Sequence, residues 1–268
     1  MSVLQSIILG IIQGIAEFLP ISSSGHLVIV QSFMDINPPL LYDILLHAAT
    51  LAAIIIVFRK SVWKLLKGFF LTVFRKGDDE DRVYFRAALF ILFASVFTAG
   101  LGFIIDRFDF KEVPKLTCVF FLVTAAVLFI SRKFQGEKTL TDLNLKNSWK
   151  DGLVIGIAQG ISALPGISRS GITISFSLFR GISREAAGEL SFLLSIPVIA
   201  GAAAIKLLKD SAELSAAVDA PAMAAGLISA FIFGLISLIL LIRLVKKGKL
   251  YYFGFYLIPA AVVSFILL

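Results

Sequence analysis

Two polar stretches, one near the start of the chain and one in its second half, carry the residue types that can do chemistry. Residues 10–25 read GIIQGIAEFLPISSSG, and residues 156–171 read GIAQGISALPGISRSG. A constant offset of 146, without a gap, aligns a glutamine, two serines and several glycines of the two stretches. Shared hydrophobicity does not account for identical polar residues. The two stretches therefore indicate an internal repeat, as is common in transporter folds.

The first stretch offers a carboxylate, an amide and a run of hydroxyls. Gln13 and Glu17 are four residues apart and therefore share one face of a helix. Glu17 can hold a divalent cation that bridges phosphate oxygens, with Gln13 completing its shell. His26 can act as the base that accepts the proton of a serine nucleophile. The turn between them can point backbone N–H groups at an anion. It consists of Ser22, Ser23, Ser24 and Gly25.

The second stretch offers a fixed positive charge among hydroxyls. Arg169 can bind phosphate oxygens in a bidentate manner and offset charge in a transition state. Its neighbours that can bind the same anion are Ser168, Ser170, Gly171 and Thr173. A purely structural ion pair between Glu17 and Arg169 is the simplest alternative, but it leaves the nearby hydroxyls and the imidazole unexplained. His47 is interpreted as a packing pair with Asp43, four residues before it.

The composition indicates that lipid surrounds much of this chain. Of its 268 residues, 58% are hydrophobic and 16% are charged, and the mean hydropathy is +0.94. A soluble domain has about 25% charged residues. The net charge of +7 does not indicate nucleic acid, because the basic residues lie in short segments between apolar runs. We therefore expect a lipid bilayer, and no nucleic acid, as a partner.

Six stretches are long and apolar enough to cross a hydrocarbon layer of roughly 30 Å. They are residues 40–58, 84–105, 116–131, 188–208, 221–242 and 250–268. Segments 2–34 and 152–180 are also apolar, but Pro, Gly and Ser interrupt them in the middle. Their arms, of roughly 10–16 residues at about 1.5 Å per residue, are too short to cross. We expect them to form re-entrant hairpins, because broken backbone at membrane depth must be packed in protein.

The distribution of Lys and Arg predicts the orientation. Segments 59–82, 132–151 and 243–249 hold seven, five and four of these residues, whereas 106–115 and 209–220 hold three and one. The positive-inside rule assigns the first three segments to the cytoplasm. The N- and C-termini are then predicted to lie outside the plasma membrane.

The number of crossings predicts an inverted repeat. Each half is a hairpin, which returns to its own side, followed by three spans, which change sides. The predicted fold is therefore an all-α polytopic membrane protein with six transmembrane helices and two re-entrant helical hairpins in an inverted-topology repeat. The halves are residues 1–135 and 146–268. Hairpins that enter from opposite sides can meet near the midplane, where transporters of this kind have their sites.

The polar motifs also support a family resemblance. With EFLPISSSGH at 17–26, PGISRSGIT at 165–173 and SFLLSIP at 191–197, the chain resembles the bacterial undecaprenyl-pyrophosphate phosphatases of the BacA/UppP family, which is linked to bacitracin resistance. The resemblance implies an inner-membrane enzyme that removes the terminal phosphate of a polyprenyl pyrophosphate, with a site open to the outer side. The lipid carrier is thereby recycled for cell-wall synthesis. A divalent cation, Mg²⁺ or Ca²⁺, is the implied cofactor.

The motifs of that family can be placed on this sequence. Its acidic motif falls on Gln13 and Glu17, and because the first position is glutamate in some members, Gln13 leaves one carboxylate for the metal. Its loop serines and histidine fall on Ser22, Ser23 and His26. Its P-G-x-S-R-S motif falls on residues 165–170, which include Arg169, and Thr173 follows.

Several alternatives stay open at this point. The nucleophile is Ser23 with His26 as its base, or His26 itself, or water. A flippase for a lipid phosphate is the second function to consider, because inverted repeats suit transport, although fold analogy alone does not establish function. The sequence leaves open whether the chain forms a homodimer.

Overall fold

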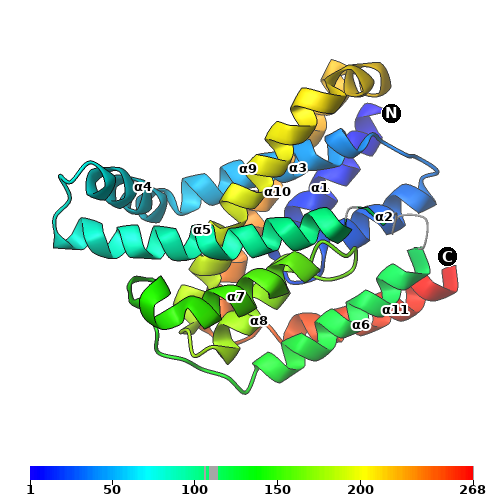
Figure 1. Ribbon diagram of the computed structural model, residues 1–268. Helices are drawn as coiled ribbons and strands as arrows, with labels where there is room; N and C mark the ends of the chain where they lie inside the picture. The colour runs from blue at the N-terminus through cyan, green and yellow to red at the C-terminus, as the bar shows by residue number, and fades with distance from the viewer. Residues whose placement is uncertain (106, 109–113, 268) are drawn as a thin grey trace.

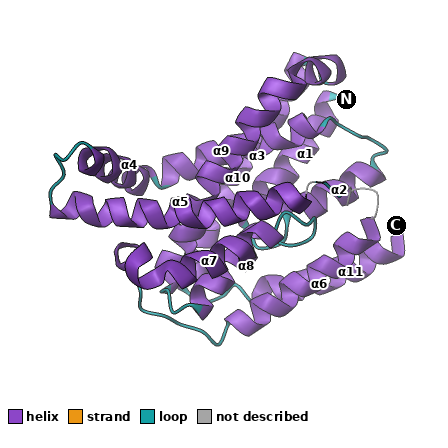
Figure 2. Ribbon diagram, in the orientation of Figure 1, coloured by secondary structure: helices purple, strands orange, loops and turns teal. Residues whose placement is uncertain are grey.

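The structure is a computed structural model that describes residues 1–105, 107–108 and 114–267. The regular structure of these residues is helical, apart from one isolated bridge between Lys138 and Ile182 (Figures 1 and 2). The elements are α1 (Val3–Phe18), α2 (Ser23–Phe33), α3 (Leu40–Val57), α4 (Arg59–Val73), α5 (Asp79–Ile105), α6 (Pro114–Ser131), η2 (Leu140–Asp142), α7 (Leu145–Ile161), α8 (Arg169–Phe179), α9 (Arg184–Ala217), α10 (Ala220–Lys246) and α11 (Tyr252–Leu267).

Four of these helices, α3, α5, α9 and α10, are long and apolar enough to cross a membrane. The helices α1, α6 and α11 are apolar but shorter. The prediction of an all-α, multi-pass membrane protein is therefore confirmed for the described part of the chain. Most of the predicted outer loop 106–115, and the last residue of the predicted span 250–268, lie outside the described residues.

Both broken segments form a pair of helices joined by a tight turn. In the first, α1 ends at Phe18 because Leu19 precedes Pro20 and adopts an extended conformation (ψ 139°). Ser22 then caps α2, its hydroxyl accepting a hydrogen bond from the N–H of Gly25. In the second, Ser168 caps α8 in the same manner. The helix α7 begins earlier than predicted, at Leu145, and is kinked at Ser148.

Each hairpin packs mainly on a long helix of the other half. The backbone of α1 lies against α10, and that of α7 lies against α5. Glycines make this approach possible, because a Cβ at Gly10 would overlap the carbonyl oxygen of Gly226, and one at Gly156 would overlap that of Ala94. The two predicted halves are therefore in contact through these helices, and α6 and α11 lie side by side (Figure 1).

The tips of the two hairpins touch. The N–H of Gly166 donates to the Ser22 hydroxyl at 3.1 Å. Gly166 adopts a φ of +102°, a backbone conformation that favours glycine. Ser22 itself has a φ of 70°, which is uncommon for a residue with a side chain and costs about 1–3 kcal/mol. The serine hydroxyl that caps α2 and accepts from the other tip holds this turn in place.

The connection between α3 and α5 is more ordered than a simple loop. The sequence predicts only a basic connection over residues 59–82, whereas the structure places α4, of 15 residues, within it. Leu65 and Gly68 are buried, and Gly68 packs against the start of α5. The many basic residues hide the helical spacing of the apolar residues between them.

Candidate functional site

A buried carboxylate lies where the two hairpins meet. Glu17, in the last turn of α1, is 6% exposed. Its Oε2 accepts a hydrogen bond from the Gln13 amide at 3.0 Å and another from the Ser23 hydroxyl at 2.6 Å. Its other oxygen, Oε1, pairs with the guanidinium of Arg169, the first residue of α8. The structure therefore brings together four predicted site residues from both hairpins.

Two polar atoms of this cluster have no partner among the described residues. Nη1 of Arg169 is buried without an acceptor, although Nη2 pairs with Glu17. Oε1 of Gln13 is buried without a donor, although its amide nitrogen donates to Glu17. An unsatisfied buried polar group costs about 1–3 kcal/mol, and more when it is charged. An anion would satisfy the free guanidinium N–H, and a cation would satisfy the free amide oxygen.

Two helix N-termini also point into the region where the tips meet. Ser22 caps α2, and Ser168 caps α8. The Ser168 and Ser170 hydroxyls lie 3.3 Å apart, and those of Ser22 and Ser24 lie 3.5 Å apart. A helix N-terminus carries a partial positive charge and free N–H groups, so both helices favour an anion here. Gly25 and Gly171 donate their N–H groups to the capping serines.

His26 is held away from Ser23. Its Nδ1 lies 2.8 Å from the carbonyl oxygen of Ser22, and its Nε2 lies 2.8 Å from the hydroxyl of Tyr256 in α11. A carbonyl oxygen can only accept, so Nδ1 carries the hydrogen and Nε2 accepts from the tyrosine. Both ring nitrogens are thus engaged, and Glu17, not His26, is the proton acceptor that contacts Ser23.

Thr173 and His47 make contacts that the sequence does not predict. Thr173 donates to Gln159, the repeat counterpart of Gln13, and does not hydrogen-bond to the Glu17 cluster in the described structure. Nε2 of His47 lies 3.4 Å from Oε2 of Glu17, and its Nδ1 lies 2.8 Å from the backbone oxygen of Asp43. The predicted pairing with Asp43 includes this main-chain hydrogen bond. The signal in the sequence was a histidine inside an apolar span, where ionisable groups are rare.

The oxygen ligands available here suit a cation whose remaining ligands are water molecules and phosphate oxygens. Among the described residues, no three His, Cys, Asp or Glu side chains gather into a metal-binding group. Glu17 and the free Oε1 of Gln13 supply one carboxylate and one amide oxygen. Mg²⁺ is commonly held by one or two carboxylates together with substrate phosphates, so these two oxygens fit such an ion.

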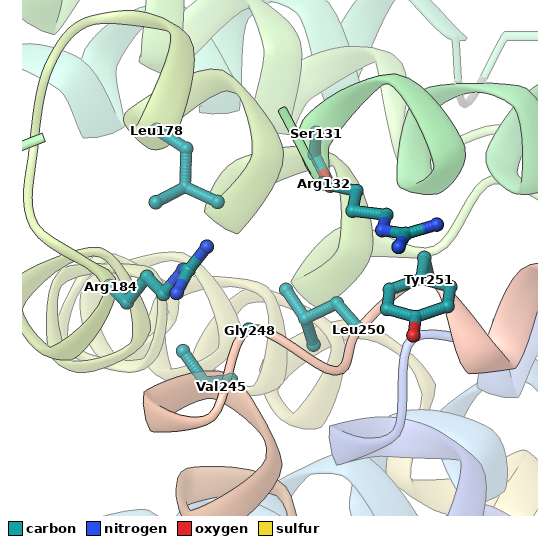
Figure 3. Close-up of a pocket in the computed structure, with 8 residues that line it drawn as sticks. All are labelled: Ser131, Arg132, Leu178, Arg184, Val245, Gly248, Leu250 and Tyr251. Atoms are coloured by element: carbon teal, nitrogen blue, oxygen red, sulfur yellow. The ribbon is translucent and has the colours of Figure 1, made fainter. Parts of the chain in front are cut away.

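The pocket drawn in Figure 3 is a different feature from this cluster. It lies where the end of α6 meets α8, α9 and the connection between α10 and α11. Its lining residues are Ser131, Arg132, Leu178, Arg184, Val245, Gly248, Leu250 and Tyr251. None of them belongs to the group around Glu17.

The fold and the site define a class: a multi-pass helical membrane protein with a buried carboxylate, arginine and serine cluster suited to phosphate. A family model described as bacitracin resistance protein BacA matches residues 6–263. The chain is 45% identical over 264 residues to the undecaprenyl-diphosphatase of Treponema denticola, covering 97% of this chain and 95% of that protein. It is 41% identical over 260 residues to that of Borrelia recurrentis, covering 96% of each. For Methanosphaera stadtmanae the identity is 39% over 278 residues, covering 100% and 98%. The chain belongs to the BacA family.

Proposed function

We propose that this protein is an undecaprenyl-diphosphatase, an integral membrane hydrolase that converts undecaprenyl pyrophosphate to undecaprenyl phosphate and inorganic phosphate. This reaction returns the lipid carrier to cell-wall synthesis. The observation that carries the proposal is the Glu17–Arg169 pair, in which Nη1 of Arg169 is buried without a partner among the described residues. The near full-length similarity to undecaprenyl-diphosphatases supports the same activity.

The pyrophosphate binds where the hairpin tips meet. Arg169 turns its free Nη1 to a phosphate oxygen, while Nη2 stays on Glu17. The N-termini of α2 and α8 add N–H groups and partial positive charge. The hydroxyls that can donate to the remaining oxygens are those of Ser22, Ser24, Ser168 and Ser170. Thr173, which donates to Gln159, is the remaining hydroxyl of the predicted substrate-binding group.

Ser23 is the nucleophile that the geometry favours. Its hydroxyl already donates to Oε2 of Glu17 at 2.6 Å, so the carboxylate can accept its proton as the oxygen attacks the terminal phosphorus. The anhydride P–O bond breaks, and undecaprenyl phosphate leaves with the electron pair. Water then hydrolyses the phosphoserine. Attack by His26 would require it to leave Tyr256 first.

A divalent cation, Mg²⁺ or Ca²⁺, would be held by Glu17 and Oε1 of Gln13. It would offset charge on the phosphate oxygens. The single protein carboxylate would make its binding depend on the substrate's phosphates, which complete the shell.

The topology supports access from the outer side. The proposed topology has six spans and two re-entrant hairpins, at 2–34 and 152–180, in inverted halves at 1–135 and 146–268. It accounts for the short helix arms and for the packing of each hairpin on the other half. Figure 1 shows both chain ends on one side of the molecule and α4 on the opposite side. With the basic segments in the cytoplasm, both termini and the site opening face outwards.

Phosphate release by the purified protein in detergent tests the activity. Transport is impossible in detergent, so release of inorganic phosphate from undecaprenyl pyrophosphate supports the hydrolase, whereas its absence with a folded, cation-supplied protein refutes it. Trapping and mapping a phosphorylated residue tests the nucleophile. Phosphate on Ser23 supports the step above, phosphate on His26 replaces it, and phosphate on neither residue favours direct attack by water.

A further inference from the structure

The helix α4 presents a large apolar face that the described protein leaves uncovered. Five large apolar side chains are about half exposed or more: Trp63 (66%), Leu66 (48%), Phe70 (54%), Val73 (52%) and Phe74 (67%). Phe74 directly follows the helix. Their spacing of three or four residues places them on one side of the helix. Exposed apolar surface of this extent in a contiguous stripe marks a site of contact with a membrane or another protein.

The remainder of α4, beside and behind this stripe, is fixed to α5. Gly68 lies so close to the start of α5 that a Cβ would lie 2.6 Å from the carbonyl oxygen of Asp81. Lys67 pairs with Asp81 at 3.1 Å, and Lys64 pairs with Glu80 at 3.1 Å. The uncovered stripe is therefore held outward by the packing of the rest of the helix, and cannot simply turn into the protein.

The connectivity places α4 at a membrane boundary. Phe58 is both the last cap of α3 and the first cap of α4, so no linker separates the two helices. After α4, a short turn leads to Asp79, where α5 begins. Both α3 and α5 are long enough to cross a bilayer. In Figure 1, α4 is seen foreshortened beside one end of α5, which lies lengthwise in the picture, so the two axes diverge.

The charges flanking the stripe suit anionic headgroups. Lys60, Arg75 and Lys76 are exposed at the two ends of α4, and within the described part of the chain no ion pair involves them. Trp63 is one of two tryptophans in the chain, a residue type that gathers at membrane interfaces. An apolar face bordered by free cations is the pattern of a helix that lies in the headgroup region.

We propose that α4 is an interfacial helix. Its apolar stripe enters the boundary between headgroups and acyl chains, and Lys60, Arg75 and Lys76 bind anionic lipid headgroups. By the topology proposed above, this is the cytoplasmic leaflet. The occupant of the stripe is thus the bilayer, and not a second copy of the chain or a soluble partner.

The depth of Trp63 tests the apolar contact. In Trp149→Phe, Trp63 is the only tryptophan, and the full chain is reconstituted in vesicles of zwitterionic and anionic phospholipids. We expect lipids brominated near the headgroup end of the acyl chain to quench Trp63 more than lipids brominated near the chain terminus. Quenching by aqueous iodide without quenching by either bromolipid would overturn the proposal. Protection from both quenchers would also overturn it, and would assign the stripe to a protein contact.

Energy transfer from Trp63 tests the choice of headgroup. We expect at least twofold more transfer to a dansyl-labelled anionic lipid than to a dansyl-labelled zwitterionic lipid. The preference should vanish when the three free cations are neutralised, in Lys60→Gln/Arg75→Gln/Lys76→Gln. A control that removes equal charge from other basic connections, Lys133→Gln/Lys247→Gln/Lys249→Gln, should keep it. Equal transfer to both lipids in the parent, or loss of the preference in the control alone, would overturn the anionic-lipid assignment.

Discussion

The Nε2 atom of His26 lies 2.8 Å from the hydroxyl of Tyr256, and the two rings stack with 14° between their planes. The first hairpin thus places its histidine against the last helix of the chain. Because Nδ1 is bound to the main chain, Nε2 is the only ring nitrogen that could reach a substrate. That nitrogen must release Tyr256 before it can contact a phosphate.

Once released from the tyrosine, Nε2 can take up a proton and donate to a phosphate oxygen, so removing the hydroxyl should ease substrate binding. A hydrogen bond of this type contributes about 1 kcal/mol, which corresponds to roughly fivefold in affinity. We expect Tyr256→Phe, which keeps the stacked ring, to lower KM by about that factor with little change in kcat. Steady-state phosphate release over a range of substrate concentrations measures both. A lower kcat at unchanged KM would instead mean that the tyrosine orients His26 for the reaction.

Loss of the guanidinium should stop the reaction. We expect Arg169→Ala to reduce kcat by about 10²–10³-fold, the loss found when a donor that stabilises transition-state charge is removed. Arg169→Lys should recover only part of it, because an ammonium cannot pair with Glu17 and a phosphate through a planar fork.

Folding must be controlled in this experiment, because Arg169→Ala leaves Glu17 buried and unpaired, which can cost about 3–5 kcal/mol. The double variant Glu17→Gln/Arg169→Ala removes the lone charge and should regain thermal stability without regaining activity. Near-normal turnover of folded Arg169→Ala would refute the role of the arginine.

The dependence of activity on divalent cations should change when Glu17 or Gln13 is substituted. A chelator is expected to abolish phosphate release by the wild type, and added Mg²⁺ or Ca²⁺ to restore it. Glu17→Gln should be inactive at every cation concentration, because the same carboxylate accepts the proton of Ser23. Gln13→Glu adds a second carboxylate, so half-maximal activity should need less cation. An unchanged cation requirement in Gln13→Glu would exclude this position from the metal shell.

His47 should affect the reaction rate by holding the Glu17 carboxylate in position. Its Nδ1 donates to the backbone oxygen of Asp43, so a hydrogen bond from Nε2 to Oε2 of Glu17, 3.4 Å away, requires an imidazolium. On this arrangement we expect His47→Leu to lower kcat by about tenfold. His47→Gln can still donate to the carboxylate and should stay within about threefold of wild type. The comparison of the two variants by kcat, with KM unchanged, separates a role in holding Glu17 from simple loss of packing. Equal loss in both variants would argue against a hydrogen bond from His47 to Glu17.

Features encoded by neighbouring residues could be predicted from the sequence. Pro20 and the serines after it end one helix and begin the next, as the broken apolar pattern indicates. The approach of Glu17 to Arg169 follows from two hairpin tips that meet, and the structure shows their ion pair. Both predictions rest on the residues that form turns and on the number of membrane crossings. Neither requires knowledge of which face each helix turns towards its neighbours.

Contacts that depend on helix rotation could not be predicted in this way. His47 reaches Glu17, and Tyr256 reaches His26, across helices whose relative rotation is set by packing along their whole length. Thr173 lies in the expected motif, yet its position on α8 turns it towards Gln159. In each case the residue type was visible in the sequence, but its partner was not.

The exchange of hairpins between the halves has a consequence for the order of events during synthesis. The helix α1 is made first, but the backbone on which it packs belongs to α10, which begins only at Ala220. At roughly 5–20 residues per second, the first hairpin waits on the order of tens of seconds for its partner. For most of that time Gln13 and Glu17 have neither Arg169 nor α10 beside them. Until then these polar groups must contact the insertion machinery or stay near the membrane–water interface. The site is therefore assembled among the last steps of folding.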